Sequence, residues 1–312
     1  MFELEVLFAN VIVPAAMVLL VCLLVLHKST LRLVHLALAV CSGLAIWAAF
    51  ALRIGFAWWP EDAWQKVPVA AMLVTAVAVV IDLVRSKPVR TPASSPATEN
   101  ASASVRLNPQ RFTLELFQGA ALAAIVACAA WLIFPTGGGW DSVLDQRYQW
   151  CAVITLAVSF SWWGIAGCQP AVASAVGLAT IPLLIASAFL NSLSMMKVTE
   201  PMIAIATVLG LCSLIDWRLT GRRTLPIMIA PTLFAMSGFV QHANLQSYLD
   251  LPRTLYFLAM LSPAIVALVA RTSQQKSKRL AIGLTIVLAL VLAAAIGGWA
   301  YTASDAGHAD EW

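Results

Sequence analysis

The chain has 312 residues, of which 61% are hydrophobic and 11% are charged, with a formal net charge of +4. A soluble globular domain averages about 45–50% apolar and about 25% charged residues, so this composition excludes an ordinary water-soluble protein. We expect the lipid bilayer to be its main partner and expect no nucleic-acid partner.

Apolar runs long enough to cross a bilayer recur along the chain. About 18 or more consecutive residues without charge are typical of a transmembrane helix. The runs are apolar on all sides, whereas the strands of a membrane barrel alternate in polarity. The sequence therefore predicts an all-α polytopic transmembrane helix bundle of about ten spans, at 6–26, 33–52, 67–84, 113–134, 149–167, 170–190, 201–217, 225–240, 254–270 and 280–301.

The first run is predicted to be a retained span rather than a cleaved signal peptide. Glu3 and Glu5 precede it, whereas a signal peptide carries positive charge there. Positive charges follow the run instead, at Lys28 and Arg32. This order of charges predicts that the N-terminus lies outside.

The loop charges agree with this orientation. Lys and Arg accumulate in short loops on the cytoplasmic side of a membrane. With the N-terminus outside, the inner connections hold 14 of the 19 Lys and Arg, and Glu99 is their only acid. The pattern predicts that the C-terminus is also outside, and that the protein is integral to a bacterial-type plasma (inner) membrane.

One predicted turn has no charge to anchor it. Residues 164–170 (GIAGCQP) must reverse the chain between the fifth and sixth spans, and we rely on their glycines and on Pro170 at a helix start. Without this turn the chain would have nine spans, and its C-terminus would lie inside.

A change of composition divides the chain. Residues 88–111 are rich in Pro, Ala, Ser and Thr and show no periodicity, which is typical of a flexible linker, here on the cytoplasmic side. We expect a three-helix transmembrane segment at 1–87, this linker, a seven-helix bundle at 112–301, and an exposed acidic tail at 302–312.

Three acids within apolar segments form the first candidate site. Asp82, Glu115 and Asp216 all lie near predicted cytoplasmic helix ends, and each has a basic neighbour in the sequence, namely Arg85, Arg111 and Arg218. Acids in a membrane segment are costly and need a reason. They form either interfacial ion pairs that fix helix depth or an inner-mouth site for a cation or proton.

Prolines suggest a second candidate site, for a substrate. Many transporters consist of two inverted repeats whose broken helices meet near mid-membrane, and ten spans divide into five plus five. Pro14 and Pro182 lie in the first helix of each half, with Asn10, Thr180 and Ser187 nearby. Proline is also common in membrane helices without such a role. Two further kinks, in the eighth and ninth spans, form an unmatched region at Pro226, Pro231 and Pro263.

No motif indicates a cofactor, a metal or a catalytic centre. The six cysteines form no CxxC pair, the four histidines are scattered, and phosphate-loop, HExxH and GxSxG motifs are missing. An enzyme is therefore disfavoured.

We expect a small-molecule or ion permease. The first alternative is a non-catalytic subunit or assembly factor, bound to another membrane protein or to a second copy through a small-residue face such as Gly119 with Ala123. The second alternative is an enzyme acting on a lipid-linked substrate through the three acids.

Overall fold

The computed structural model describes residues 8–28, 31–54, 62–85, 109–135, 145–194, 196–218, 225–247 and 251–309. All regular structure in these ranges is helical. It consists of a π-helical turn, η1 (Phe8–Ile12), a 3-10 turn, η2 (Ala63–Lys66), and the α-helices α2 (Val13–Lys28), α3 (Leu31–Ile54), α4 (Val67–Arg85), α5 (Pro109–Ile133), α6 (Arg147–Ala166), α7 (Pro170–Ser194), α8 (Met196–Arg218), α9 (Leu225–Leu245), α10 (Arg253–Ser273) and α11 (Lys278–Ala309).

The helices fall where the apolar runs predicted them, one for each range. Eight segments of the described chain are long and apolar enough to cross a membrane: Ala63–Ile81, Glu115–Ile133, Arg147–Ala166, Pro170–Ser194, Thr199–Arg218, Leu225–Leu245, Arg253–Ser273 and Lys278–Ser304. Two shorter apolar helical stretches, Phe8–Leu20 and Gly43–Leu52, lie on the first two helices. The all-α membrane class is thus supported, while ten spans and the sides of the termini remain predictions.

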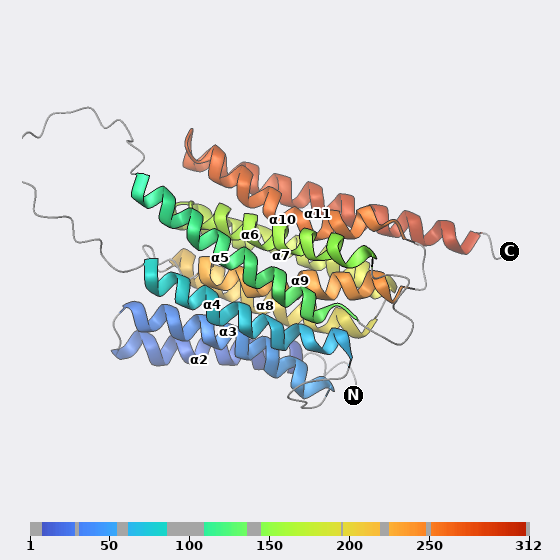
Figure 1. Ribbon diagram of the computed structural model, residues 1–312, viewed down its shortest axis with the longest axis horizontal. Helices are drawn as coiled ribbons and strands as arrows, with labels where there is room; N and C mark the ends of the chain where they lie inside the picture. The colour runs from blue at the N-terminus through green and yellow to red at the C-terminus, as the bar shows by residue number, and fades with distance from the viewer. Residues whose placement is uncertain are drawn as a thin grey trace, which may run out of the picture.

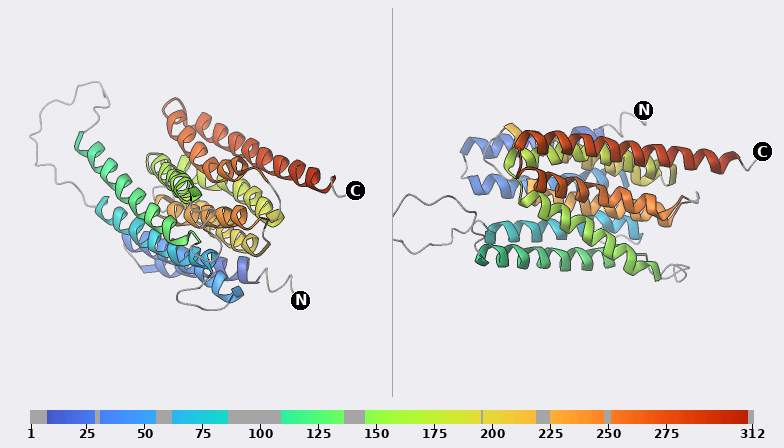
Figure 2. Two further views of the ribbon diagram at one scale, coloured as in Figure 1. Left: turned by 45° about the vertical axis from the view of Figure 1, so that its right-hand side comes forward. Right: turned by 90° about the horizontal axis from the view of Figure 1, so that it is seen from above.

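The helices lie side by side in one elongated bundle (Figure 1). α2 and α3 lie at one side of this bundle and α11 at the opposite side, and the beginning of α2 and the end of α11 lie at the same end of it (Figures 1 and 2). α3 packs against α8 and α4 packs against α9, so the first three helices and the last seven share one interior. Residues 88–108 of the predicted linker lie outside the described residues, and α11 continues through 302–309 of the predicted tail.

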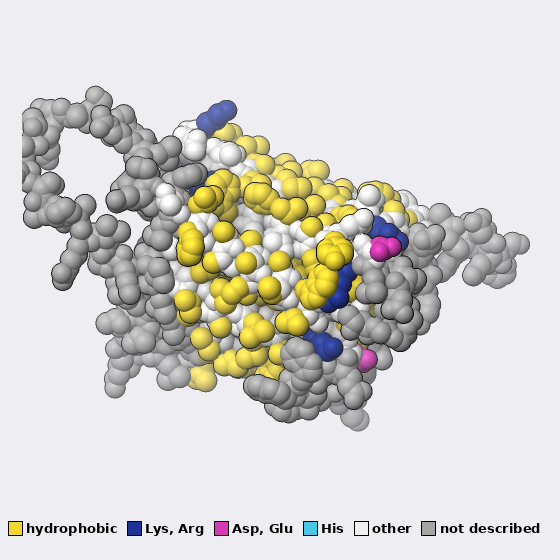
Figure 3. All heavy atoms as spheres, viewed as in Figure 1, with side chains coloured by type: hydrophobic (Ala, Val, Ile, Leu, Met, Phe, Trp, Pro, Cys, Tyr) yellow, Lys and Arg dark blue, Asp and Glu magenta, His cyan; other side chains and the backbone are white. Residues whose placement is uncertain are grey.

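The face shown in Figure 3 has an apolar middle and charged side chains toward the two ends of the bundle. Several large hydrophobic side chains on α11 are more than half exposed, as at Val287, Leu290 and Val291. Such a surface is stable where lipid rather than water solvates it. The surface therefore agrees with the composition in favouring a membrane environment.

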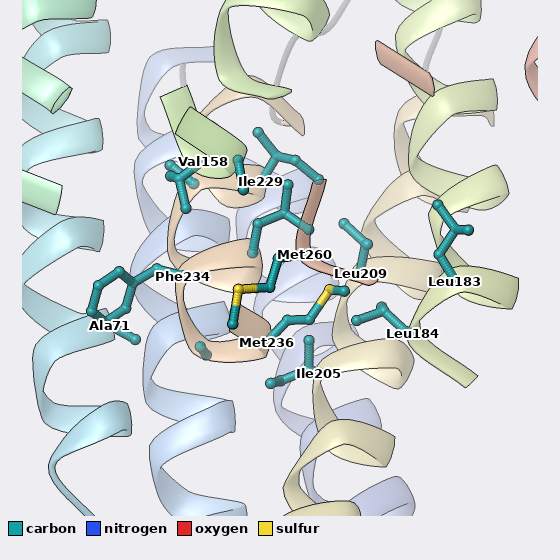
Figure 4. Close-up of a cluster of buried hydrophobic side chains, with 14 of the residues drawn as sticks. Ala71, Val158, Leu183, Leu184, Ile205, Leu209, Ile229, Phe234, Met236 and Met260 are labelled. Atoms are coloured by element: carbon teal, nitrogen blue, oxygen red, sulfur yellow. The ribbon is translucent and has the colours of Figure 1, made fainter. Parts of the chain in front are cut away.

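α9 is the central helix. All its residues from Leu225 to Ala243 are buried, and it packs against α3, α4, α5, α6, α7, α8 and α10. Figure 4 shows Phe234 of α9 directed toward Ala71 of α4, whereas Met236 lies on the other side of α9 with Met260, Leu209 and Leu184. A helix that is apolar on all sides is one that other helices surround.

The turn predicted between the fifth and sixth spans is present, because α6 ends at Ala166 and α7 begins at Pro170. Two glycines allow α10 to approach this region. A Cβ atom on Gly164 would lie 2.8 Å from the Cβ of Ala267, and one on Gly167 would lie 2.5 Å from Cζ of Arg271. The glycines thus set the close packing of α6 against α10 as well as the turn.

Candidate functional site

Asp216 lies at the N-terminal end of α9. Its Oδ2 accepts a hydrogen bond from the Leu225 backbone N–H at 2.8 Å, and its side chain is 4% exposed. The first amides of a helix have no partner within the helix, and its N-terminus carries a partial positive charge. The carboxylate of Asp216 on α8 therefore acts as a cap for α9.

The other two predicted inner-mouth acids lie on helices that do not pack along α8. Glu115 is half-buried on α5, which packs on α4 and α6. Asp82 belongs to α4, but its side chain lies outside the described part of the chain. α9 lies between α8 and this pair of helices, since it contacts all three. The hydrogen bond from Asp216 to the start of α9 therefore explains why an acid is buried at this position.

The two proline sites lie on helices separated by α8. Asn10 and Pro14 are buried at the start of the chain, where η1 and α2 pack against α3 and α8. α7, which carries Pro182, packs against α8, α9, α10 and α11. In an exact inverted repeat, α2 would lie beside α6 in the same way as α7 lies beside α11. In the structure, α6 packs instead with α5, α9 and α10.

The hydroxyl groups predicted to assist Pro182 are bonded within their own helix. Thr180 donates to the carbonyl of Val176 at 2.8 Å, and Ser187 donates to that of Leu183 at 2.8 Å. Pro182 is half-buried and lies two residues from Thr180, about 200° around the helix axis. Thr180 and Ser187 therefore point to a different side of α7 from Pro182.

The carbonyl that Pro263 frees in α10 is satisfied locally. Pro263 removes the amide that would bond the carbonyl of Ala259, and the hydroxyl of Ser262 donates to that carbonyl at 2.9 Å. Neighbouring hydroxyl groups commonly satisfy carbonyls that proline frees in membrane helices. The Ala259 carbonyl is therefore not left free for a ligand.

The C-terminal half of α9, beyond Pro231, is different. Ser237 and Gln241 are 1% and 0% exposed, and neither the hydroxyl of Ser237 nor the amide of Gln241 has a hydrogen-bond partner. Nε2 of the fully buried His242 donates to the Ile133 carbonyl of α5 at 3.0 Å, while its Nδ1 has no partner. Ser237 and Gln241 are four residues apart and so lie on one side of the helix.

Three Ser and Thr residues in the described chain have a buried hydroxyl without a hydrogen-bond partner, namely the half-buried Ser159 and Thr199 and the fully buried Ser237. Eleven of the twelve buried Ser and Thr residues in the described chain donate to a carbonyl three or four positions earlier, namely Thr75, Ser161, Ser174, Thr180, Ser187, Ser194, Ser213, Thr232, Ser262, Ser273 and Thr285. The hydroxyl of Ser237 makes no such bond. It is therefore available to a group outside its own helix.

A second unpartnered amide lies at a similar level of the bundle. Gly177 of α7 lies against Leu225 of α9, which fixes the register of the two helices. Asn191 is 14 residues beyond Gly177, and Gln241 is 16 residues beyond Leu225. At 1.5 Å per residue, these are rises of about 21 and about 24 Å. Asn191 and Gln241 therefore lie at similar levels along the bundle. Asn191 is 0% exposed, and neither atom of its side-chain amide has a hydrogen-bond partner.

These unpartnered groups lower the stability of the folded protein. A buried polar group without a partner costs about 1–3 kcal/mol in mutational data. Met or Leu at position 241 would avoid this cost, so packing alone does not explain Gln241. The C-terminal half of α9, with Asn191 of α7 at a similar level, is the best candidate site for a polar ligand.

Sequence reasoning missed this region because it ended the eighth span at residue 240. Gln241 and His242 were read as part of an outer loop, whereas α9 extends to Leu245 and both side chains are fully buried. The sequence did offer one signal, because Ser237 and Gln241 are spaced one helical turn apart, on the same helix as Pro231.

The chemistry of the site is hydrogen bonding by neutral groups. Within the described ranges, no three His, Cys, Asp or Glu side chains gather as metal ligands would. Neither a family model, nor a curated protein, nor a solved structure matches the chain. Amide, hydroxyl and imidazole groups at helix interfaces can bind a polar molecule through hydrogen bonds.

Proposed function

We propose that this protein is a permease for small uncharged polar solutes, which pass through the bundle along the C-terminal half of α9. The observation that carries this proposal is the group of unpartnered polar side chains on an enclosed helix, Ser237 and Gln241. Helices in lipid associate through close packing and through hydrogen bonds between helices. A polar side chain that is buried without a partner contributes no such hydrogen bond, so a purely structural role does not explain it.

The placement of charge supports a neutral solute. In the helices of the structure, every Asp, Glu, Lys and Arg lies within about two turns of a helix end. A charged solute would pay a large desolvation cost in an interior with no opposite charge. Amide and hydroxyl groups, in contrast, can replace the water around a neutral polar molecule.

Pro231 supports movement of this part of α9. It removes the amide that would bond the Ile227 carbonyl, and kinks in helices are commonly found at proline. Ser237 and Gln241 lie on the segment beyond this point. Movement of that segment relative to its neighbours would expose the unpartnered groups to solute.

Solute entry into proteoliposomes tests the proposal. Purified protein is reconstituted, and the rate of swelling is followed by light scattering after mixing with urea, acetamide, ethylene glycol or glycerol. We expect at least one solute to enter faster than in protein-free vesicles, with no acceleration for choline or acetate ions. Equal rates for all four neutral solutes with and without protein would overturn the proposal.

A second candidate function is that of a subunit bound to another membrane protein through α11. α11 buries mainly small residues against its neighbours, as at Ala281 and Ala289, and Gly283, Gly297 and Gly298 have open space where a side chain would be. Small residues allow close approach of a second helix in lipid. Substitution Gly297→Leu should then reduce cross-linking of α11 to its partner in native membranes, and unchanged cross-linking would contradict this role.

A further inference from the structure

Ser237 lies on the side of α9 that faces α6. Successive residues of a helix are about 100° apart around its axis. Met236 of α9 lies toward α8 and α10, and Gly238 lies against Val67 of α4 and Ile133 of α5. Ser237 lies between these two directions.

α6 occupies this side of α9. Phe239 lies another 100° around the axis from Gly238, and its ring stacks on that of Phe50. This side of α9 therefore faces α3. α6 packs against α9 along this interface. Ser237 therefore lies where α6 meets α9, and Gln241, about 40° further round the axis, lies between this direction and that of Gly238.

The two groups define the chemistry of their ligand. A carboxamide side chain presents an N–H donor and a carbonyl acceptor next to each other, with the same spacing as another amide. Two such groups can form two hydrogen bonds at once. Ser237, one turn earlier on the same face, adds a hydroxyl that can donate or accept.

We infer that the C-terminal half of α9 binds small molecules with a primary carboxamide or urea group, through the amide of Gln241 and the hydroxyl of Ser237. This inference rests on the proposed permease function and names its substrate class. Oε1 of Gln241 accepts from the N–H of the ligand, and Nε2 donates to the ligand carbonyl. Polyols lack this paired donor and acceptor, so they gain less from the site.

Substitution Gln241→Met tests the inference in the same proteoliposomes. Methionine has a similar length and size but lacks both amide atoms. We expect wild-type protein to admit acetamide and urea faster than ethylene glycol and glycerol, after subtraction of the protein-free rates. In the variant this preference should fall about tenfold, which corresponds to about 1.4 kcal/mol.

Two further variants separate binding from folding. Thr232→Val changes another buried position on α9, but the hydroxyl of Thr232 already donates to Met228 at 2.6 Å, so we expect the amide preference to persist. Gln241→Asn keeps an amide on a shorter side chain and should restore part of the preference. If Gln241→Met does not fold, a comparison of Gln241→Asn and Gln241→Leu provides the same test.

The outcomes distinguish this inference from the proposed function. Entry of all four solutes without a preference for amides, or the same preference in Gln241→Met, would overturn the inference and leave the permease function standing. Where no solute enters, thermal unfolding with and without acetamide still tests binding. Acetamide should raise the unfolding temperature of the wild type but not that of Gln241→Met, and an equal effect on both would overturn binding as well.

Discussion

Gln274, the residue that follows α10, holds the turn between α6 and α7 through hydrogen bonds to Gln169 and Gly167. Oε1 accepts from the Gln169 backbone N–H at 2.9 Å, and Nε2 donates to the Gly167 carbonyl at 2.9 Å. Next to it, Arg271 donates to the Trp163 carbonyl at 2.5 Å, with its guanidinium 3.7 Å from the centre of the Trp163 ring. A turn without charged residues of its own is thus anchored by α10.

Substitution Arg271→Lys should destabilise the protein although it keeps the charge. Lysine cannot reproduce the flat guanidinium that stacks on Trp163 and bonds its carbonyl at the same time. We expect a loss of about 1 kcal/mol, measured by thermal unfolding in detergent. Gln274→Ala should cost a similar amount, because it removes both bonds to the turn. No change in unfolding temperature for either variant would show that α10 does not hold this turn.

Substitution Gly164→Ala should separate α6 from α10. Its added Cβ would lie 2.9 and 3.0 Å from the backbone C and O of Ala267, which cannot rotate away. We expect destabilisation by about 1–3 kcal/mol, as for other overpacked interiors. Gly283→Ala in α11 is the matched control, since nothing lies within 4 Å of the new Cβ, and it should leave stability unchanged or raise it by up to about 1 kcal/mol. Equal effects of the two changes would contradict the packing described.

Substitutions at Asp216 distinguish a helix cap from a cation site. Asparagine keeps an oxygen that accepts the Leu225 N–H, so Asp216→Asn should be milder than Asp216→Ala, which we expect to cost about 1–2 kcal/mol. Thermal unfolding measures both. A cation site would instead require the negative charge, and solute entry would then be lost equally in both variants with little difference in stability.

The helices could be predicted from the sequence because hydrophobic run length and loop charge depend on local composition. The boundary at residue 240 could not, because Gln241 and His242 are polar and read as a loop. Their burial depends on neighbours distant in the sequence, such as Ile133 of α5, whose carbonyl accepts a hydrogen bond from His242. Single-sequence periodicity contains no information on that contact.

The candidate site was difficult to predict for a similar reason. Thr180, Ser187 and Ser237 look equivalent in the sequence, since each is a hydroxyl in an apolar run. Only the structure separates the first two, which bond their own helix, from Ser237, which does not. The prolines were equally ambiguous, because the carbonyl freed by Pro263 is satisfied by Ser262.

Cysteine labelling at Ser237 tests most directly whether solute reaches this face of α9. Ser237→Cys and the control Ala235→Cys, about 200° away around the same helix, are made after replacement of the six native cysteines. Reconstituted protein is treated with 2-hydroxyethyl methanethiosulfonate, a small neutral polar reagent. We predict that Ser237→Cys reacts, that acetamide slows the reaction, and that Ala235→Cys stays unmodified. Equal labelling of the two positions, or no labelling of Ser237→Cys, would contradict a solute path along α9.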